Sequence, residues 1–235
     1  MIPIRDDQPR YSTPYVNYFV IGLNALVFLL FEPPTQSRAF QLMTLQFGLI
    51  PHDFTRALAG SAQYPLGANL LTILTSMFMH GSFFHVLGNM WFLWIFGDNI
   101  EDHLGHFSYL IFYLICGIAA ALTDIALTPT SNVPLIGASG AIAGVMGAYI
   151  VLYPRARVQT LVILIVFFTI WWLPAWFFLG YWFFIQFIAT SVVATSAHHQ
   201  TGGVAFAAHV GGFVAGLILI KLFPGRKHAQ RYASW

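Results

Sequence analysis

The chain has 235 residues, of which 58% are hydrophobic and 8% are charged, and its mean hydropathy is +0.72. Soluble domains carry roughly 25% charged residues, so this composition excludes an ordinary soluble domain and predicts a polytopic membrane protein. The net charge of +2 argues against nucleic-acid binding, and the single Cys116 excludes a disulfide framework.

Six apolar stretches are candidates for membrane spans, since a bilayer core takes about 20 residues of helix. We expect helices over residues 15–31, 83–99, 107–127, 137–153, 174–191 and 203–223. The long apolar stretch 158–197 leaves two alternatives open. It could hold two short crossings broken at Pro174, or one crossing with an interfacial or re-entrant piece.

The basic residues decide between these alternatives and set the orientation. Eight of the ten Lys and Arg residues fall on one side of the expected spans, which the positive-inside rule assigns to the cytoplasm. They are Arg5, Arg10, Arg155, Arg157, Lys221, Arg226, Lys227 and Arg231. The fourth and last spans then run in the same direction, so an odd number of crossings separates them. One crossing, beginning near Pro174, is the simplest solution.

The chain is therefore expected to be an all-α, multi-pass protein of the cell (inner) membrane, with six spans and both termini in the cytoplasm. A single membrane domain over 1–235 would have a cytoplasmic N-terminal tail at 1–14 and a cytoplasmic C-terminal tail at 224–235. Residues 32–82 would form an outer loop that is longer than a simple connector needs.

The outer loop contains its own apolar pattern. Phe40, Met43, Phe47 and Ile50 recur at helical spacing, which predicts an amphipathic helix lying in the interface. A second apolar piece, 70–79, leads into the second span. Simple packing and a role in gating or substrate access are both open for this loop.

Four polar residues stand inside the apolar spans, where an unpartnered polar group is costly. Ser139 begins the fourth span, and His209 lies near the start of the sixth. His85 and Asn89 share one face of the second span at i and i+4. A serine among glycines usually serves packing, and a lone histidine is usually structural. All four fall in the outer third of their spans, and this joint pattern indicates a site.

These residue types match what acyl transfer needs. A serine becomes a nucleophile when a neutral imidazole removes its proton. The oxyanion that forms needs donors, which an Asn amide, a His ring and a backbone N–H at a helix start can supply. We interpret Ser139 and His209 as catalytic, and His85 and Asn89 as oxyanion-stabilising.

No carboxylate is well placed to complete a catalytic triad. Asp124 is at the outer end of the third span, whereas Asp98, Glu101 and Asp102 are on the inner side. We therefore predict a Ser–His dyad in which packing or a neutral partner orients His209.

Glycines predict that the fourth and sixth spans pack closely, because small residues let two helix backbones approach each other. These glycines are Gly140, Gly144 and Gly147 in the fourth span and Gly212 and Gly216 in the sixth. Such an approach would bring the hydroxyl of Ser139 within reach of His209, although ordinary packing would use the same glycines.

At these residues the chain closely resembles the rhomboid family of intramembrane serine proteases. The matching stretches are 137–140 (GASG), 208–212 (AHVGG) and 85–89 (HVLGN), and 75–81 (TSMFMHG) and 101–105 also look like the flanks of the family's second span. Three motifs on three helices in the right order make the resemblance specific, and it covers nearly all of residues 15–223.

The resemblance implies a six-helix rhomboid fold with a water-filled cavity that opens outward. It implies Ser139 as nucleophile and His209 as general base and acid, with Asn89, His85 and the Ser139 amide as oxyanion donors. It implies single-span membrane proteins as substrates, cut near the outer end of helices that unwind easily, and no cofactor or metal. Two features depart from the family's pattern. Ala143 stands where many members stack an aromatic ring on the histidine, and the Trp-Arg pair of the first outer loop is missing.

Three other functions were weighed against an intramembrane serine endopeptidase. A catalytically inactive rhomboid-like protein that binds and guides client transmembrane helices would need no complete dyad or oxyanion donors. A transporter or channel would favour inverted repeats and midplane sites. A zinc metalloprotease would need an HExxH motif, and the adjacent His198 and His199 lie in an expected outer loop.

Overall fold

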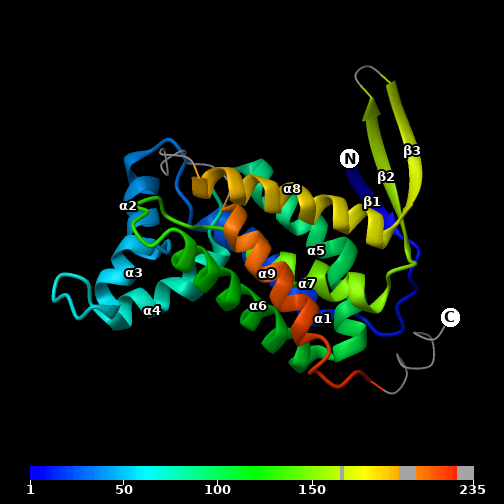
Figure 1. Ribbon diagram of the computed structural model, residues 1–235, viewed down its shortest axis with the longest axis horizontal. Coiled ribbons are helices and arrows are strands. Elements are labelled where there is room, and N and C mark those ends of the chain that lie inside the picture. Colours follow the sequence, from blue (N-terminus) through cyan, green and yellow to red (C-terminus); the bar gives the residue numbers. More distant parts are fainter. Residues whose placement is uncertain (165–166, 196–204, 227–235) are drawn as a thin grey trace.

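The computed structural model describes residues 1–164, 167–195 and 205–226 (Figure 1). His198, His199, Lys227 and Arg231, named above, lie outside this part, as does the beginning of the sixth expected span. The described chain is mostly helical, which confirms the coarse prediction of a helical membrane protein. Its helices are joined by a small antiparallel sheet that the prediction of an all-α protein did not include.

Helices occur at all six positions where spans were expected. They are α1 (Tyr15–Leu30), α5 (Phe83–Leu104), α6 (His106–Leu127), α7 (Ser139–Leu152), α8 (Ala175–Thr195) and α9 (Phe206–Leu219). In the described chain, α6 and the Ala175–Val192 part of α8 are long and apolar enough to cross a membrane. The helical segment Leu66–Phe78 and the helix that follows it, α5, pass this test only when they are counted together as one bent pair. The helices α1, α7 and α9 are apolar but shorter. The number of six crossings therefore stays a prediction.

The outer loop consists of short helices gathered at one end of the molecule (Figure 1). They are α2 (Arg38–Phe47), α3 (Pro51–Leu58), α4 (Leu66–Thr75) and the 3₁₀ turn η1 (Ser76–Phe78). The helix expected around Phe40 is present as α2, in which Phe40 and Thr44 are buried, but it ends at Phe47, before Ile50. Its location in the membrane interface stays a prediction. The second apolar piece forms α4 and η1, which meet α5 at a bend of 80°.

A three-stranded antiparallel sheet occupies the opposite end of the molecule. Its strands are β1 (Ile2–Asp6), β2 (Arg157–Leu164) and β3 (Phe167–Pro174), paired in the order β1-β2-β3. Most of the ambiguous segment before Pro174 is therefore a β-hairpin, neither a crossing nor a re-entrant helix, and part of the N-terminal tail is a strand. The physical reason is the alternation in β2, where Val158, Thr160 and Val162 are buried while the intervening side chains are not.

The sheet connects two helices that border the functional site. β1 contacts α5, and the indole N–H of Trp91 on α5 donates to the carbonyl oxygen of Pro3 at 2.6 Å. β2 and β3 contact α8, and β3 passes into α8 directly at Pro174. A proline suits this junction because its fixed φ fits the first turn of a helix and its missing N–H is not needed there.

The core is built around α7, which packs against α5, α6, α8 and α9. Every residue of α7 from 140 to 149 is buried. The predicted close packing of α7 on α9 is confirmed. A Cβ added at Gly212 or Gly216 would overlap the carbonyl oxygens of Gly140 and Gly144, respectively. The backbones of the two helices are therefore in direct contact.

At the C-terminal end of α5, one buried carboxylate holds α1 on α5. The carboxylate of Glu101 is fully buried and accepts hydrogen bonds from the backbone N–H groups of Val16 and Asn17, at 3.0 and 2.6 Å. These N–H groups belong to the first turn of α1, where an anion is favourable because the helix leaves them without intrahelical acceptors. Glu101 thus has structural partners in the first turn of α1, at the C-terminal end of α5 and far from Ser82 and His85 at its start.

The glycine contact predicts a sharp difference between two Gly→Ala substitutions. Gly216→Ala places a methyl group against the backbone of α7, and relieving that overlap costs about 1–3 kcal/mol. Gly180→Ala, in α8, meets nothing within 4 Å and changes stability by about 1 kcal/mol or less. Thermal unfolding in detergent should therefore show a clear loss of stability for the first variant alone. Equal unfolding temperatures would contradict direct backbone contact.

Candidate active site

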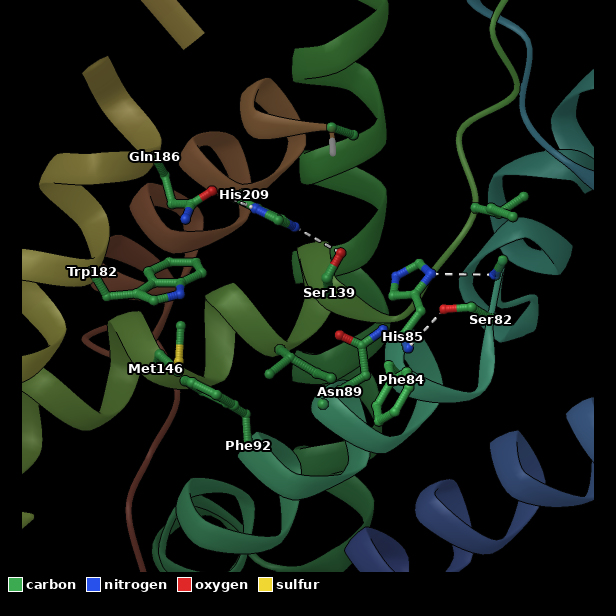
Figure 2. Close-up of a pocket in the computed structure, with 15 residues that line it drawn as sticks. Ser82, Phe84, His85, Asn89, Phe92, Ser139, Met146, Trp182, Gln186 and His209 are labelled. Atoms are coloured by element: carbon green, nitrogen blue, oxygen red, sulfur yellow. Dashed lines mark hydrogen bonds between the residues drawn. The ribbon is translucent and has the colours of Figure 1, made fainter. Parts of the chain in front are cut away.

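The structure brings Ser139 and His209 together across the α7–α9 contact. Ser139 is the first residue of α7, and His209 lies in the first turn of α9. The Oγ of Ser139 is 2.8 Å from Nε2 of His209, a normal hydrogen-bond distance (Figure 2). His209 is buried, with 8% of its surface exposed. A serine hydroxyl and an imidazole at this distance can exchange a proton.

The other ring nitrogen of His209 also has a partner. Nδ1 lies 2.8 Å from Oε1 of Gln186, which comes from α8 (Figure 2). An amide oxygen can only accept, so Nδ1 carries the proton and Nε2 is left with a lone pair toward Ser139. The neutral partner expected for His209 is therefore the amide of Gln186, a residue that belongs to none of the sequence motifs. The sequence offers one indication of Gln186, which is the single amide in an otherwise apolar stretch.

An aromatic ring packs against His209, although Ala143 offers none. The indole of Trp182 on α8 lies with its centroid 5.6 Å from that of His209, at an interplanar angle of 38°. Trp182 precedes Gln186 by four residues, so both side chains leave the same face of α8. The ring that the family's pattern places one turn after the serine is here supplied by another helix.

His85 and Asn89 lie on the other side of Ser139 (Figure 2). Nδ1 of His85 accepts a hydrogen bond from the N–H of Gly81 at 3.2 Å, so its proton is on Nε2, which points toward Gly137. The amide nitrogen of Asn89 is buried and has no hydrogen-bond partner among the described residues. A buried donor without a partner is costly, so this group is available for an acceptor that enters the cavity.

The backbone that precedes Ser139 is held in place by hydrogen bonds to the segment 49–76. Gly137 has a φ of +124°, which residues with a Cβ rarely adopt, and its N–H donates to the carbonyl oxygen of Ser76 at 2.8 Å. Leu135 pairs with Leu49 of the outer loop through two backbone hydrogen bonds of 2.7 and 3.1 Å. The outer loop therefore positions the start of α7, where the first N–H groups lack intrahelical acceptors.

One cavity of about 620 Å³ is lined by all six side chains described above, those of Ser139, His209, His85, Asn89, Gln186 and Trp182. Its walls come from α5, α7, α8 and α9 and from the short segments that precede α5, α7 and α9. The residues that line it are Gly81, Ser82, Phe84, His85, Gly88, Asn89, Phe92, Ile136, Ser139, Ile142, Met146, Trp182, Gln186, Ala205 and His209. The four residues selected from the sequence are thus brought into one cavity, together with Gln186 and Trp182.

A second histidine packs behind His85. His80, in the segment between η1 and α5, is fully buried, and its ring centroid is 5.1 Å from that of His85. Its backbone N–H donates to the carboxylate of Glu32 at 2.8 Å. Burial, and secondarily the neighbouring His85, lowers the pKa of His80 to about 3, and burial raises the pKa of Glu32 to about 7. His80 is therefore neutral near pH 7 and adds no charge beside His85.

The carboxylates considered in the sequence have partners elsewhere. Asp98 lies 3.6 Å from the guanidinium of Arg10, and Asp102 accepts from the backbone N–H of Tyr11 at 3.0 Å. Asp124 accepts from the hydroxyl of Thr128 at the end of α6. The described residues around His209 supply an amide and not a carboxylate.

A serine, a histidine in the matching tautomer and unpartnered donors around one cavity are the parts of a serine-hydrolase-type site, here set between apolar helices. Residues 67–226, more than half of the chain, match the Rhomboid domain. The chain belongs to the rhomboid family.

Curated relatives agree with this assignment. Rhomboid protein 1, mitochondrial, of Saccharomyces cerevisiae is 27% identical over 206 residues, which cover 86% of this chain and 51% of that protein. The presenilin-associated rhomboid-like protein, mitochondrial, of Homo sapiens is 29% identical over 140 residues, or 59% of this chain and 33% of that protein. Rhomboid-like protein 11, chloroplastic, of Arabidopsis thaliana is 37% identical over 71 residues, 30% of this chain and 25% of that protein. The chain thus spans about half or less of the length of these relatives.

Gly137 offers a test of the site's geometry. In Gly137→Ala the new methyl group would lie 2.8 Å from Nε2 of His85, and a φ of +124° strains any residue with a side chain. We expect labelling of Ser139 by a fluorophosphonate, which reacts with activated serines, to slow at least about tenfold. Gly67→Ala, in open space on α4, is the matched control and should label normally. Unchanged labelling of the Gly137 variant would contradict the proposed position of His85.

Proposed function

We propose that this protein is an intramembrane serine endopeptidase that cleaves single-span membrane proteins near the outer face of the membrane. The observation that carries the proposal is the 2.8 Å contact between Ser139 Oγ and His209 Nε2, in the same cavity as the unpartnered amide of Asn89. Membership of the rhomboid family supports the same reaction.

The first half of the reaction acylates the serine. Nε2 of His209 takes the hydroxyl proton of Ser139 while Oγ attacks the carbonyl carbon of the scissile peptide bond. The carbonyl oxygen becomes an oxyanion, which accepts from the Asn89 amide, the Nε2–H of His85 and the backbone N–H of Ser139. His209 then gives its proton to the leaving amine, the C–N bond breaks, and an acyl-serine remains.

The second half repeats these steps with water. His209 removes a proton from the water molecule as its oxygen attacks the acyl carbon, and the same donors hold the second oxyanion. The C–O bond to Ser139 then breaks, and the proton returns from His209 to Oγ. The enzyme is restored, and the substrate has been hydrolysed with no group other than these side chains and backbone donors.

The chemistry also indicates the kind of substrate. A carbonyl group inside an intact helix is hydrogen-bonded to the N–H four residues later and is shielded from attack. The scissile segment must therefore unwind before it reaches Ser139. Helices with small or helix-breaking residues near their outer end unwind at the least cost, which favours single-span proteins of that composition as substrates.

Orientation follows from the ends of the bundle. The N-terminus and the last turn of α9 lie away from α2, α3 and α4 (Figure 1). The exposed Arg5, Arg155 and Arg157 belong to or adjoin the sheet at the same end as the N-terminus. We propose that this end faces the cytoplasm at the cell (inner) membrane, with Ser139 nearer the outer face.

Replacement of the nucleophile tests the function directly. Ser139→Ala should reduce cleavage of a single-span model substrate in liposomes by about 10⁴-fold or more, because the acyl intermediate cannot form. Ser191→Ala, in which the lost hydroxyl donates to the backbone of α8, is the control and should cleave normally.

Fluorophosphonate labelling gives the second measurement. Wild-type protein should be labelled at Ser139, and His209→Ala should abolish the labelling because the hydroxyl loses its base. Full cleavage by the Ser139 variant would sink the proposal. A folded wild-type protein that neither labels nor cleaves would instead favour the inactive, client-guiding alternative.

A further inference from the structure

Gln186 has an environment that packing alone does not require. It is half-buried on α8, a helix whose other side chains near the cavity are apolar or aromatic. α8 is already joined to α9 by stacked rings, since Phe183 and Phe213 lie 4.7 Å apart at 27°. The amide of Gln186 is therefore not the only group that joins the two helices.

The amide of Gln186 meets the one atom that decides the protonation pattern of His209. In a neutral imidazole one nitrogen carries the proton and the other accepts. With Oε1 of Gln186 at 2.8 Å, Nδ1 donates and Nε2 is free to accept from Ser139. In the opposite tautomer, Nε2–H would point at the serine hydroxyl and could not remove its proton. The acceptor therefore selects the reactive form.

A neutral acceptor suits this location better than a carboxylate. The cavity lies between apolar helices, where an ionised side chain is costly unless it has a strong partner. Gln186 contributes its carbonyl dipole without such a charge. When His209 becomes an imidazolium during the reaction, its bond to Gln186 becomes charge-assisted and therefore stronger. The amide then stabilises the charge that forms on the ring.

We propose that Gln186 is a positioning residue for the base, so that the site works as a Ser139–His209–Gln186 relay that is complete only while α8 packs against α9. This inference rests on the proposed function. Trp182 and Gln186 approach the ring from the same face of α8, one through a tilted ring contact and one through a hydrogen bond. Movement of α8 away from α9 removes both contacts at once. The position of this helix therefore regulates the base.

Kinetics of three variants on α8 test the proposal. Gln186→Leu removes the acceptor but keeps an apolar side chain of similar bulk. We expect its kcat for a single-span model substrate in liposomes to fall by about 10- to 100-fold with KM within about twofold, as for the loss of a hydrogen bond to a charged group. Gln186→Glu retains an acceptor at the same reach and should restore most of the loss. Thr190→Val, one turn further along α8, removes a hydroxyl bonded to the backbone of Gln186 and is the control.

Nitrogen NMR gives a readout that a purely structural role would not change. In protein with ¹⁵N-labelled histidine, the signals of the His209 ring are identified by their loss in His209→Ala. Wild-type protein and Thr190→Val should show the proton on Nδ1, whereas Gln186→Leu should show a mixture of both tautomers. Thermal unfolding of the same samples establishes that each variant is folded.

The outcomes separate this inference from the proposed function. If Gln186→Leu keeps the wild-type kcat and the wild-type tautomer, the relay is wrong while the Ser–His site stands. If the kcat of Gln186→Leu falls only as far as its loss of thermal stability explains, or if its KM alone rises, Gln186 has a structural role. The relay is wrong in that case too. If folded wild-type protein is not labelled by the fluorophosphonate, the proposed function fails first.

Discussion

Direct backbone contact between α7 and α9 governs the geometry of the site. A Cβ added at Gly212 or Gly216 of α9 would overlap the backbone carbonyl oxygen of Gly140 or Gly144 of α7, respectively. The two helices therefore run together along the core, and their first turns place Ser139 beside His209. In a membrane, where apolar side chains gain little from leaving lipid, such close packing is a main source of helix association.

Around this contact, the polar groups of the cavity are kept neutral and directed. Gln186 holds the proton of His209 on the nitrogen away from Ser139, and the N–H of Gly81 holds the proton of His85 on the nitrogen that faces the cavity. Asn89 keeps a donor without a partner. Because the surroundings are apolar, each hydrogen bond is strong and each open donor is costly, so a developing oxyanion would be bound tightly.

Much of the site could be predicted from the sequence, but its supports could not. Ser139, His209, His85 and Asn89 stand out because polar residues are rare in apolar spans, and the comparisons confirm the resemblance to rhomboids. Gln186 is also a rare polar residue in its apolar span, but it belongs to no sequence motif. Its role depends on His209, which lies 23 positions later in the chain. The β-hairpin could not be predicted because the apolar residues 158–173 fit a crossing or an interfacial or re-entrant piece as well as a pair of strands, and the third strand of the sheet comes from the other end of the chain.

The sequence by itself determined the membrane class, the positions of the main helices, the family and the polar residues of the cavity, because hydropathy, helical spacing and local motifs are properties of the chain. Only the tertiary structure decided which groups support those residues. Trp182 replaces the ring that Ala143 lacks, Gln186 selects the tautomer of His209, and His80 lies neutral behind His85. The first two of these contacts join α8 to the following helix, α9, and in all three the distance and direction between the two groups decide the effect. No pattern in the linear sequence contains that information.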